Sequence, residues 1–144
     1  MPDRIMLAAA CLACWPCWSQ AESGPSQAAP SEAALDDAVR LGTVATLAPL
    51  CGMRDEAWSF DLRRAAVMDA TRAPQPDDET LRRVPGRDLA VAALSHAEAE
   101  ALEAFAEMPA SDTCGPLAHD PELARADRAV QAFRWLKAGA KPGS

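Results

Sequence analysis

The sequence has no tyrosine, only two histidines and no run rich in lysine or arginine. Its seven glycines are scattered, so they do not form the glycine-rich loop that cradles phosphates. The G-x-S-x-G elbow of serine hydrolases and the C-x-x-C-H motif of c-type haem attachment do not occur either. These absences favour a protein that is not an enzyme and carries no cofactor.

Charge and hydrophobicity describe a folded acidic domain. The 144 residues carry a formal net charge of -7, and 49% of them are apolar and 24% charged. This composition is typical of a globular protein, and the length is that of one domain. A chain of this charge repels phosphate backbones, so nucleic acid is not expected as a partner.

The first 21 residues have the three-part pattern of a secretory signal peptide. A short polar start with Arg4 precedes an apolar stretch from Ile5 to Trp18, and small residues lie at the -3 and -1 positions of a cleavage between Ala21 and Glu22. The stretch is about 14 residues long, shorter than the roughly 20 that cross a bilayer as a helix. We therefore expect an exported protein, periplasmic in a bacterium or else secreted, with no transmembrane span in the mature chain.

Three cysteines within that segment, Cys11, Cys14 and Cys17, form a C-x-x-C-x-x-C run. Such a run can hold a metal or an iron–sulfur cluster. Cleavage would remove it and no partner motif follows, so no metal site is predicted. The three alanines before Cys11 also resemble a lipoprotein box, although that motif usually has leucine at its -3 position. Lipidation at Cys11 and cleavage after Ala21 stay open as alternatives.

Cleavage would leave two cysteines, Cys51 and Cys114. An even, small number of cysteines in an exported protein favours a disulfide, and two cysteines allow one intramolecular pairing. Closing a loop of about 60 residues stabilises a fold by roughly 4 kcal/mol through the chain entropy of the unfolded state. Two free or intermolecular thiols are the alternative.

The remaining chain divides into a linker, a domain and a tail. Residues 22–30 are rich in serine, proline and alanine, which predicts a flexible linker. Residues 31–139 contain repeated amphipathic segments and are expected to form one helical domain. Residues 140–144 are expected to be a disordered tail.

Two helices are predicted in the first half of the domain. Ser31 can cap a first helix whose apolar stripe ends near Cys51. Gly42 interrupts one side of this helix and costs about 1 kcal/mol relative to alanine. The second helix starts at Asp55, and its pattern fades near Thr71.

The middle of the chain is harder to interpret. Residues 73–80 predict an exposed loop, which a short helical turn follows. The run 89–94 is ambiguous between helix and strand, and we prefer helix because a strand would have no pairing partner. Ser95 and Glu98 have the spacing of a capping box, which predicts a third helix from Ser95 to Met108.

The last predicted helix has the strongest start signal. A loop carrying Cys114 leads to Asp120 and Pro121, a capping acid followed by proline at the first helical position. The apolar stripe of this helix is Leu123, Ala126, Val130, Phe133 and Leu136. Together the segments predict an all-α fold, a small bundle of about four amphipathic helices with one disulfide.

No catalytic, cofactor-binding or metal-binding residues are predicted. His96 and His119 have no cysteine or histidine at metal-ligand spacing. Ser95 and His96 are adjacent, which is not how catalytic triads are assembled. The interface candidates are aromatic: Trp58, which is also a core candidate, Phe133, and Trp135, which falls off the stripe of its helix.

Three functions follow as hypotheses. The first is a non-catalytic periplasmic protein that binds another protein, as an accessory subunit of a cell-envelope complex. The second is a soluble carrier of a small ligand or metal, with a pocket lined by Trp58, Met68 and Phe105. The third is a small enzyme or enzyme inhibitor that uses an exposed loop at residues 73–88.

Overall fold

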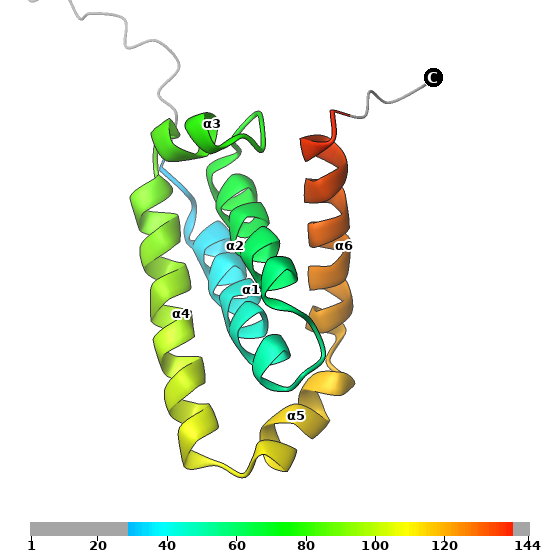
Figure 1. The fold of residues 1–144 in the computed structure, drawn as a ribbon. Coiled ribbons are helices and arrows are strands. Elements are labelled where there is room, and N and C mark those ends of the chain that lie inside the picture. The colour runs from blue at the N-terminus through cyan, green and yellow to red at the C-terminus, as the bar shows by residue number, and fades with distance from the viewer. Residues whose placement is uncertain (1–28, 140–144) are drawn as a thin grey trace, which may run out of the picture.

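The structure is a computed structural model that describes residues 29–139, and within them it has six helices and no strand (Figure 1). The helices are α1 (Glu32–Leu50), α2 (Glu56–Thr71), α3 (Asp78–Arg83), α4 (Arg87–Glu107), α5 (Ala110–Ala118) and α6 (Pro121–Lys137). The predicted all-α class is confirmed. The predicted signal peptide with its three cysteines, most of the linker and the tail lie outside the described residues.

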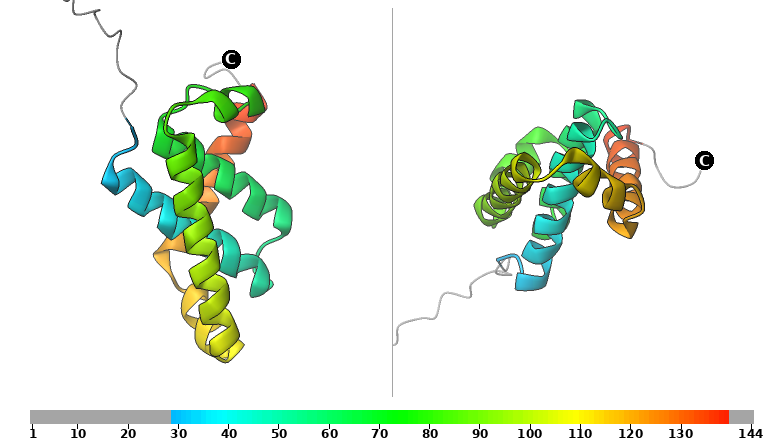
Figure 2. Two further views of the ribbon diagram at one scale, coloured as in Figure 1. Left: turned by 90° about the vertical axis from the view of Figure 1, so that its left-hand side faces the viewer. Right: turned by 90° about the horizontal axis from the view of Figure 1, so that it is seen from below.

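The helices form three layers. In Figure 1, α1 and α2 lie in the middle, with α4 on one side and α6 on the other. A view from the side of α4 shows this helix crossing obliquely over the α1–α2 pair (Figure 2). The short helices α3 and α5 lie at opposite ends of the bundle (Figure 1). None of the helices in residues 29–139 is long and apolar enough to cross a membrane.

The core is built from the apolar stripes of all the helices. Its large buried side chains include Phe133 and Leu62, which are almost completely covered. Alanines occupy much of the rest of the core, because layers in close contact leave room for little more. The buried alanines are Ala38, Ala45, Ala48, Ala66, Ala70, Ala73, Ala90, Ala97, Ala101 and Ala126.

Three of the predicted helix starts are confirmed by their caps. The side chains of Ser31, Asp55 and Asp120 each accept a hydrogen bond from a backbone N–H of the following first turn, at 3.2, 2.7 and 2.9 Å. These bonds satisfy N–H groups that have no partner inside the helix. Each of these three residues is therefore the N-cap that the sequence predicted.

The predicted start at Ser95 is wrong. Helix α4 is continuous over Arg87–Glu107 and follows Gly86, whose φ is 81°. The ambiguous run 89–94 is helical, as preferred. Alanine is the best helix former, and six alanines between residues 89 and 101 carry the helix through Ser95. A Ser-x-x-Glu spacing marks a start only where the preceding chain is not already helical.

The predicted loop around Cys114 is also wrong, since Cys114 lies in α5. This helix has nine residues, buries only Leu117 and contains Gly115 and Pro116, two poor helix formers that favour a loop in a reading of the sequence. Together with α3, it raises the number of helices above the predicted four.

Gly42 lies at the contact between α1 and α4, where a side chain would not fit. A Cβ atom at this position would lie 3.1 Å from the Cβ of Ala97 and 3.1 Å from a methyl group of Leu94. The two helices therefore approach more closely here than a larger residue would allow. Glycine lowers the stability of the helix relative to alanine, and the close packing of α1 on α4 offsets this cost.

Pro49 lies inside the last turn of α1, where its missing N–H leaves the carbonyl of Ala45 without its usual helical donor. The hydroxyl of Ser59, a buried residue of α2, donates to that carbonyl at 2.5 Å. A side chain of the neighbouring helix thus replaces the hydrogen bond that the proline removes.

Ser59→Ala is expected to lower the free energy of unfolding by about 1–3 kcal/mol, because it leaves a buried carbonyl unsatisfied. In a Pro49→Ala background the same substitution should cost less, because the N–H of residue 49 can then reach the Ala45 carbonyl. Urea unfolding of the four proteins of this double-mutant cycle measures the difference. Equal costs in the two backgrounds would show that Ser59 does not replace the missing bond.

Candidate functional site: a groove between α2 and α4

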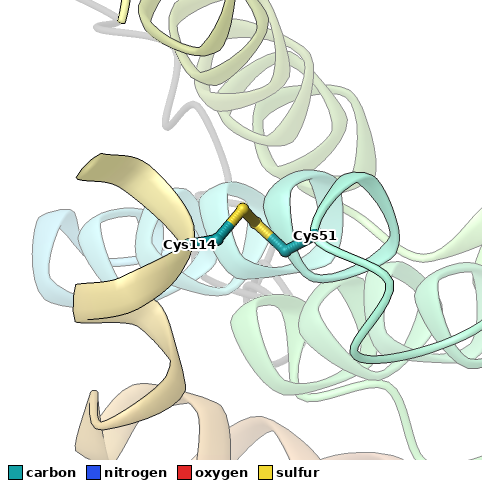
Figure 3. The surroundings of a disulfide bond; sticks show 2 residues. All are labelled: Cys51 and Cys114. Atoms are coloured by element: carbon teal, nitrogen blue, oxygen red, sulfur yellow. A yellow bond between two sulfur atoms is a disulfide. The ribbon is translucent and has the colours of Figure 1, made fainter. Parts of the chain in front are cut away.

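The predicted disulfide between Cys51 and Cys114 is present and joins the end of α1 to α5 (Figure 3). The two Cα atoms are 5.5 Å apart, a separation typical of disulfides. Disulfides persist in oxidising compartments, which this bond therefore indicates.

The three aromatic interface candidates lie in different environments. Trp58 and Phe133 are in the core, with 6% and 2% of their surface exposed. Trp135 is 45% exposed near the end of α6. While the bundle is folded, a partner could touch Trp135 but neither of the other two.

Trp58 has a polar role that the sequence did not reveal. Its indole N–H donates to Oδ1 of Asp127 in α6 at 3.1 Å, and Arg54 donates to both oxygens of the same carboxylate at 2.9 and 2.6 Å. The guanidinium of Arg54 also lies over the indole ring, 5.7 Å from its centre. This cluster of three side chains fastens α6 to the beginning of α2.

Two further ion pairs attach α6 to the central layer. Arg125 donates to both carboxylate oxygens of Asp37 in α1, at 3.2 and 2.8 Å. Arg134 donates to Asp61 of α2 at 2.7 Å. Hydrogen bonding from Arg54 lowers the pKa of Asp127, and hydrogen bonding from Arg125 lowers the pKa of Asp37. The ionised form of each carboxylate is thus favoured in the folded state.

These lowered pKa values predict how stability depends on pH. A carboxylate with a lowered pKa contributes stability above its unfolded-state pKa, near 3.9 for aspartate, and loses it as the pH falls through the lower folded value. At pH 7, Asp127→Asn is expected to cost about 1 kcal/mol, since the pair is partly exposed and screened. The difference from the unsubstituted protein should shrink as the pH falls below about 4, because aspartate in the unfolded chain is protonated there before the ion-paired Asp127 of the folded protein.

Denaturant unfolding at pH 7 and at pH 3 measures this change. Asp36→Asn is the matched control, because Asp36 is exposed and makes no ion pair within residues 29–139. It should have little effect at either pH. A cost of Asp127→Asn that is the same at both pH values would contradict the assigned role of the carboxylate.

On the side of α4, the central layer is covered incompletely, because α4 packs mainly on α1. The uncovered surface of α2 beside α4 forms a groove, which we call the α2–α4 groove. One part, of about 580 Å³, lies between α2, α3 and α4, and a second, of about 440 Å³, extends toward the end of α1. The two parts adjoin at Phe60, Arg63 and Glu98, where Arg63 pairs with Glu98 across the groove.

Facing stripes of two helices line this groove. Helix α4 contributes residues at three- and four-residue spacing from Arg87 to Leu102, and α2 contributes a matching stripe. The α4 residues are Arg87, Val91, Leu94, Ser95, Glu98 and Leu102, and the α2 residues are Glu56, Ser59, Phe60, Arg63, Arg64 and Val67. At about 1.5 Å per residue, the α4 stripe is about 22 Å long, which is the length of a helix of about four turns.

The lip of the groove is hydrophobic. Phe60, Leu50 and Leu102 are 59%, 45% and 44% exposed, and all three line its second part. They come from three different helices, α2, α1 and α4, and gather at one place. Exposed apolar residues that cluster in this way are typical of interaction sites.

The other end of the groove is rich in arginine. Arg63, Arg64, Arg82 and Arg87 line the part between α2, α3 and α4, against the two carboxylates of Asp78 and Glu98. Arg63 pairs with Glu98 at 3.4 Å, Arg64 pairs with Asp78, and Arg87 pairs with Asp88 at 3.2 Å. This lining has an excess of positive charge in a chain whose net charge is -7.

The predicted ligand pocket and the predicted exposed loop are not found. Trp58 and Met68 line two different hollows, and Phe105 lines neither, so the pocket expected from these three residues is not formed. Residues 73–88 are not simply an exposed loop, because they contain α3 and bury Ala73 and Leu81.

The two histidines lie apart from each other at the surface. His96 is an exposed residue of α4, 3.4 Å from Glu100, and His119 follows α5. Among the described residues, no group of three or more histidine, cysteine, aspartate or glutamate side chains is placed to hold a metal ion.

Comparison with known proteins finds no family model, no curated protein and no solved structure that matches this chain.

Proposed function

We propose that this chain is an exported, non-catalytic protein that binds a helix of a partner protein in the α2–α4 groove, as an accessory subunit of a cell-envelope complex. The observation that carries the proposal is the groove: two facing helix stripes, an exposed hydrophobic lip and an arginine-rich end. The signal-peptide pattern of residues 1–21 and the Cys51–Cys114 bond support export.

The shape of the groove favours a helix as its occupant. A helix laid along α2 beside α4 would complete the layer that α4 covers only in part. Such a helix would place apolar side chains, three and four residues apart, against Phe60, Leu50 and Leu102, in the manner of helix-in-groove recognition. It would remove this apolar surface from water, and such burial is the main source of binding free energy.

The charges of the groove indicate which side chains the bound helix carries beside its apolar stripe. Four arginines at one end favour acidic side chains beside the apolar stripe of the bound helix, because complementary charges steer association and fix register. A partner carboxylate would have to compete with Asp78 and Glu98 for these guanidiniums. We therefore assign as the partner an amphipathic helix of about 15 residues with acid at one end.

A displayed peptide library tests this assignment. The library is a helix of about 15 residues with a fixed apolar stripe, in which the flanking positions vary between glutamate, glutamine and lysine. The full chain, with its disulfide formed, should enrich peptides with glutamate at one end of the stripe. Equal recovery of glutamate and lysine at those positions would contradict the charge assignment.

Two substitutions locate the binding surface. Phe60→Asp should reduce the affinity of the enriched peptides at least tenfold, because it places a charge in the hydrophobic lip. Trp135→Asp, a matched change at an exposed aromatic residue of α6, should leave their affinity within about twofold. Retained binding by Phe60→Asp, with folding verified by circular dichroism, would refute the groove as the binding site.

A further inference from the structure

A second hollow lies on the other side of the central layer, between α2 and α6. Its volume is about 590 Å³, within the range of about 300–1,000 Å³ that is typical of small-molecule sites. Its apolar lining comes from three helices: Leu41 of α1, Met68 of α2, and Phe133 and Leu136 of α6. It does not depend on the α2–α4 groove, which opens on the side of α4.

Arg72 at the rim of this hollow has an unusual backbone. Its φ of 54° and ψ of 37° are left-handed, and it is the only residue other than glycine with a positive φ between residues 29 and 139. The other turns with positive φ in this part of the chain use glycine: Gly52, Gly86 and Gly139. A left-handed residue that ends a helix is usually glycine, because a Cβ atom is strained there. The arginine side chain at this position therefore comes with a cost in folding that glycine would avoid.

The same hollow collects further positive charge. Arg125 and Arg128 of α6 line it together with Arg72, and Asp69 is the one carboxylate of the lining. Arg125 is held by Asp37 and Glu122. Arg72 and Arg128 make no ion pair with any residue in the described part of the chain. Two guanidiniums are thus available beside an apolar floor.

We propose that this hollow binds a small aliphatic carboxylate, with the alkyl chain against Met68 and Leu136 and the carboxylate between Arg72 and Arg128. Guanidinium groups match carboxylates in geometry and charge, and the adjacent apolar surface removes the chain from water. The charge of Arg72 in this site would give a function to a side chain whose backbone conformation is costly.

Isothermal titration of the full chain, with its disulfide formed, tests the proposal with three probes: octanoate, 1-octanol and inorganic phosphate. Octanoate should bind with a Kd below about 1 mM. 1-Octanol has the alkyl chain without the charge, and phosphate has charge without the chain. Both should bind at least tenfold more weakly than octanoate. Equal affinity for octanoate and either other probe would overturn the proposal, as would no binding of octanoate.

Two variants and one control distinguish a site from nonspecific adsorption. Arg72→Gly should weaken octanoate binding at least fivefold and leave 1-octanol binding unchanged, while its melting temperature stays the same or rises. Arg128→Gln should weaken octanoate binding to a similar degree. Arg83→Gln removes an exposed arginine that pairs with Glu79 and does not line the hollow, so it should bind all probes as before. Unchanged octanoate binding in both variants would overturn the proposal.

Discussion

Replacing Cys51 and Cys114 together by serine is expected to lower the free energy of unfolding by about 4 kcal/mol. The bond closes a loop with a sequence separation of 63 residues, and opening it returns to the unfolded chain the conformational freedom that the bond removes. Domains of this size are stable by only about 5–15 kcal/mol, so the loss is a large fraction of the total. The folded state should also change locally, because α5 buries only Leu117 and would lose its covalent attachment to α1.

Guanidinium unfolding of the oxidised protein and of the double-serine variant measures this loss. The unsubstituted protein kept reduced is the matched control, because it has the same open chain without a change of sequence. Its stability should agree with that of the double-serine variant. A difference of less than 1 kcal/mol between the oxidised protein and both open forms would contradict a stabilising role of the bond.

Phe133→Ala is expected to lower the free energy of unfolding by about 3–5 kcal/mol. Phe133 is one of the two largest side chains that are almost completely buried, and it lies where α6 meets the central layer. Its ring also lies beneath the guanidinium of Arg64, 5.3 Å from the ring centre. Truncation would open a cavity in the core.

Trp135→Ala is the matched control, an aromatic truncation two residues away on the same helix. Trp135 is 45% exposed, so the substitution should cost less than about 1 kcal/mol. Thermal or urea unfolding of both variants measures the contrast. Similar losses of unfolding free energy for the two variants would contradict the burial of Phe133 and the exposure of Trp135.

The helices that the sequence predicted best are those with a local capping signal at the start. Ser31, Asp55 and Asp120 form caps that depend only on their own first turn. The apolar stripe behind Asp120 faces the core except at Leu136, which is 41% exposed. The start at Ser95 failed because the capping signal is local, whereas the alanine-rich stretch before it had already formed a helix. Helix α5 was missed because its stability depends on Cys51 and on contacts with α1, which are distant in the sequence.

The site could be predicted less well than the fold. The pairing of Cys51 with Cys114 follows from counting cysteines, and the exposure of Trp135 follows from its position off the stripe. The groove has no sequence signal, because its lining comes from four helices and its arginines resemble those of any solvated helix face. The same is true of Asp127, whose partners Arg54 and Trp58 are about 70 residues earlier in the chain, at separations of 73 and 69.

Site-specific photo-crosslinking in the cells that produce the protein tests the partner-binding groove most directly. A photoreactive amino acid at position 95, which lines the groove, is compared with one at position 96, an exposed neighbour on α4 that does not line it. We predict an adduct from position 95 and none from position 96. Mass spectrometry should assign the crosslinked segment to an amphipathic helix with more acidic than basic residues. Equal adducts from the two positions, or none from position 95, would contradict a partner helix in the α2–α4 groove.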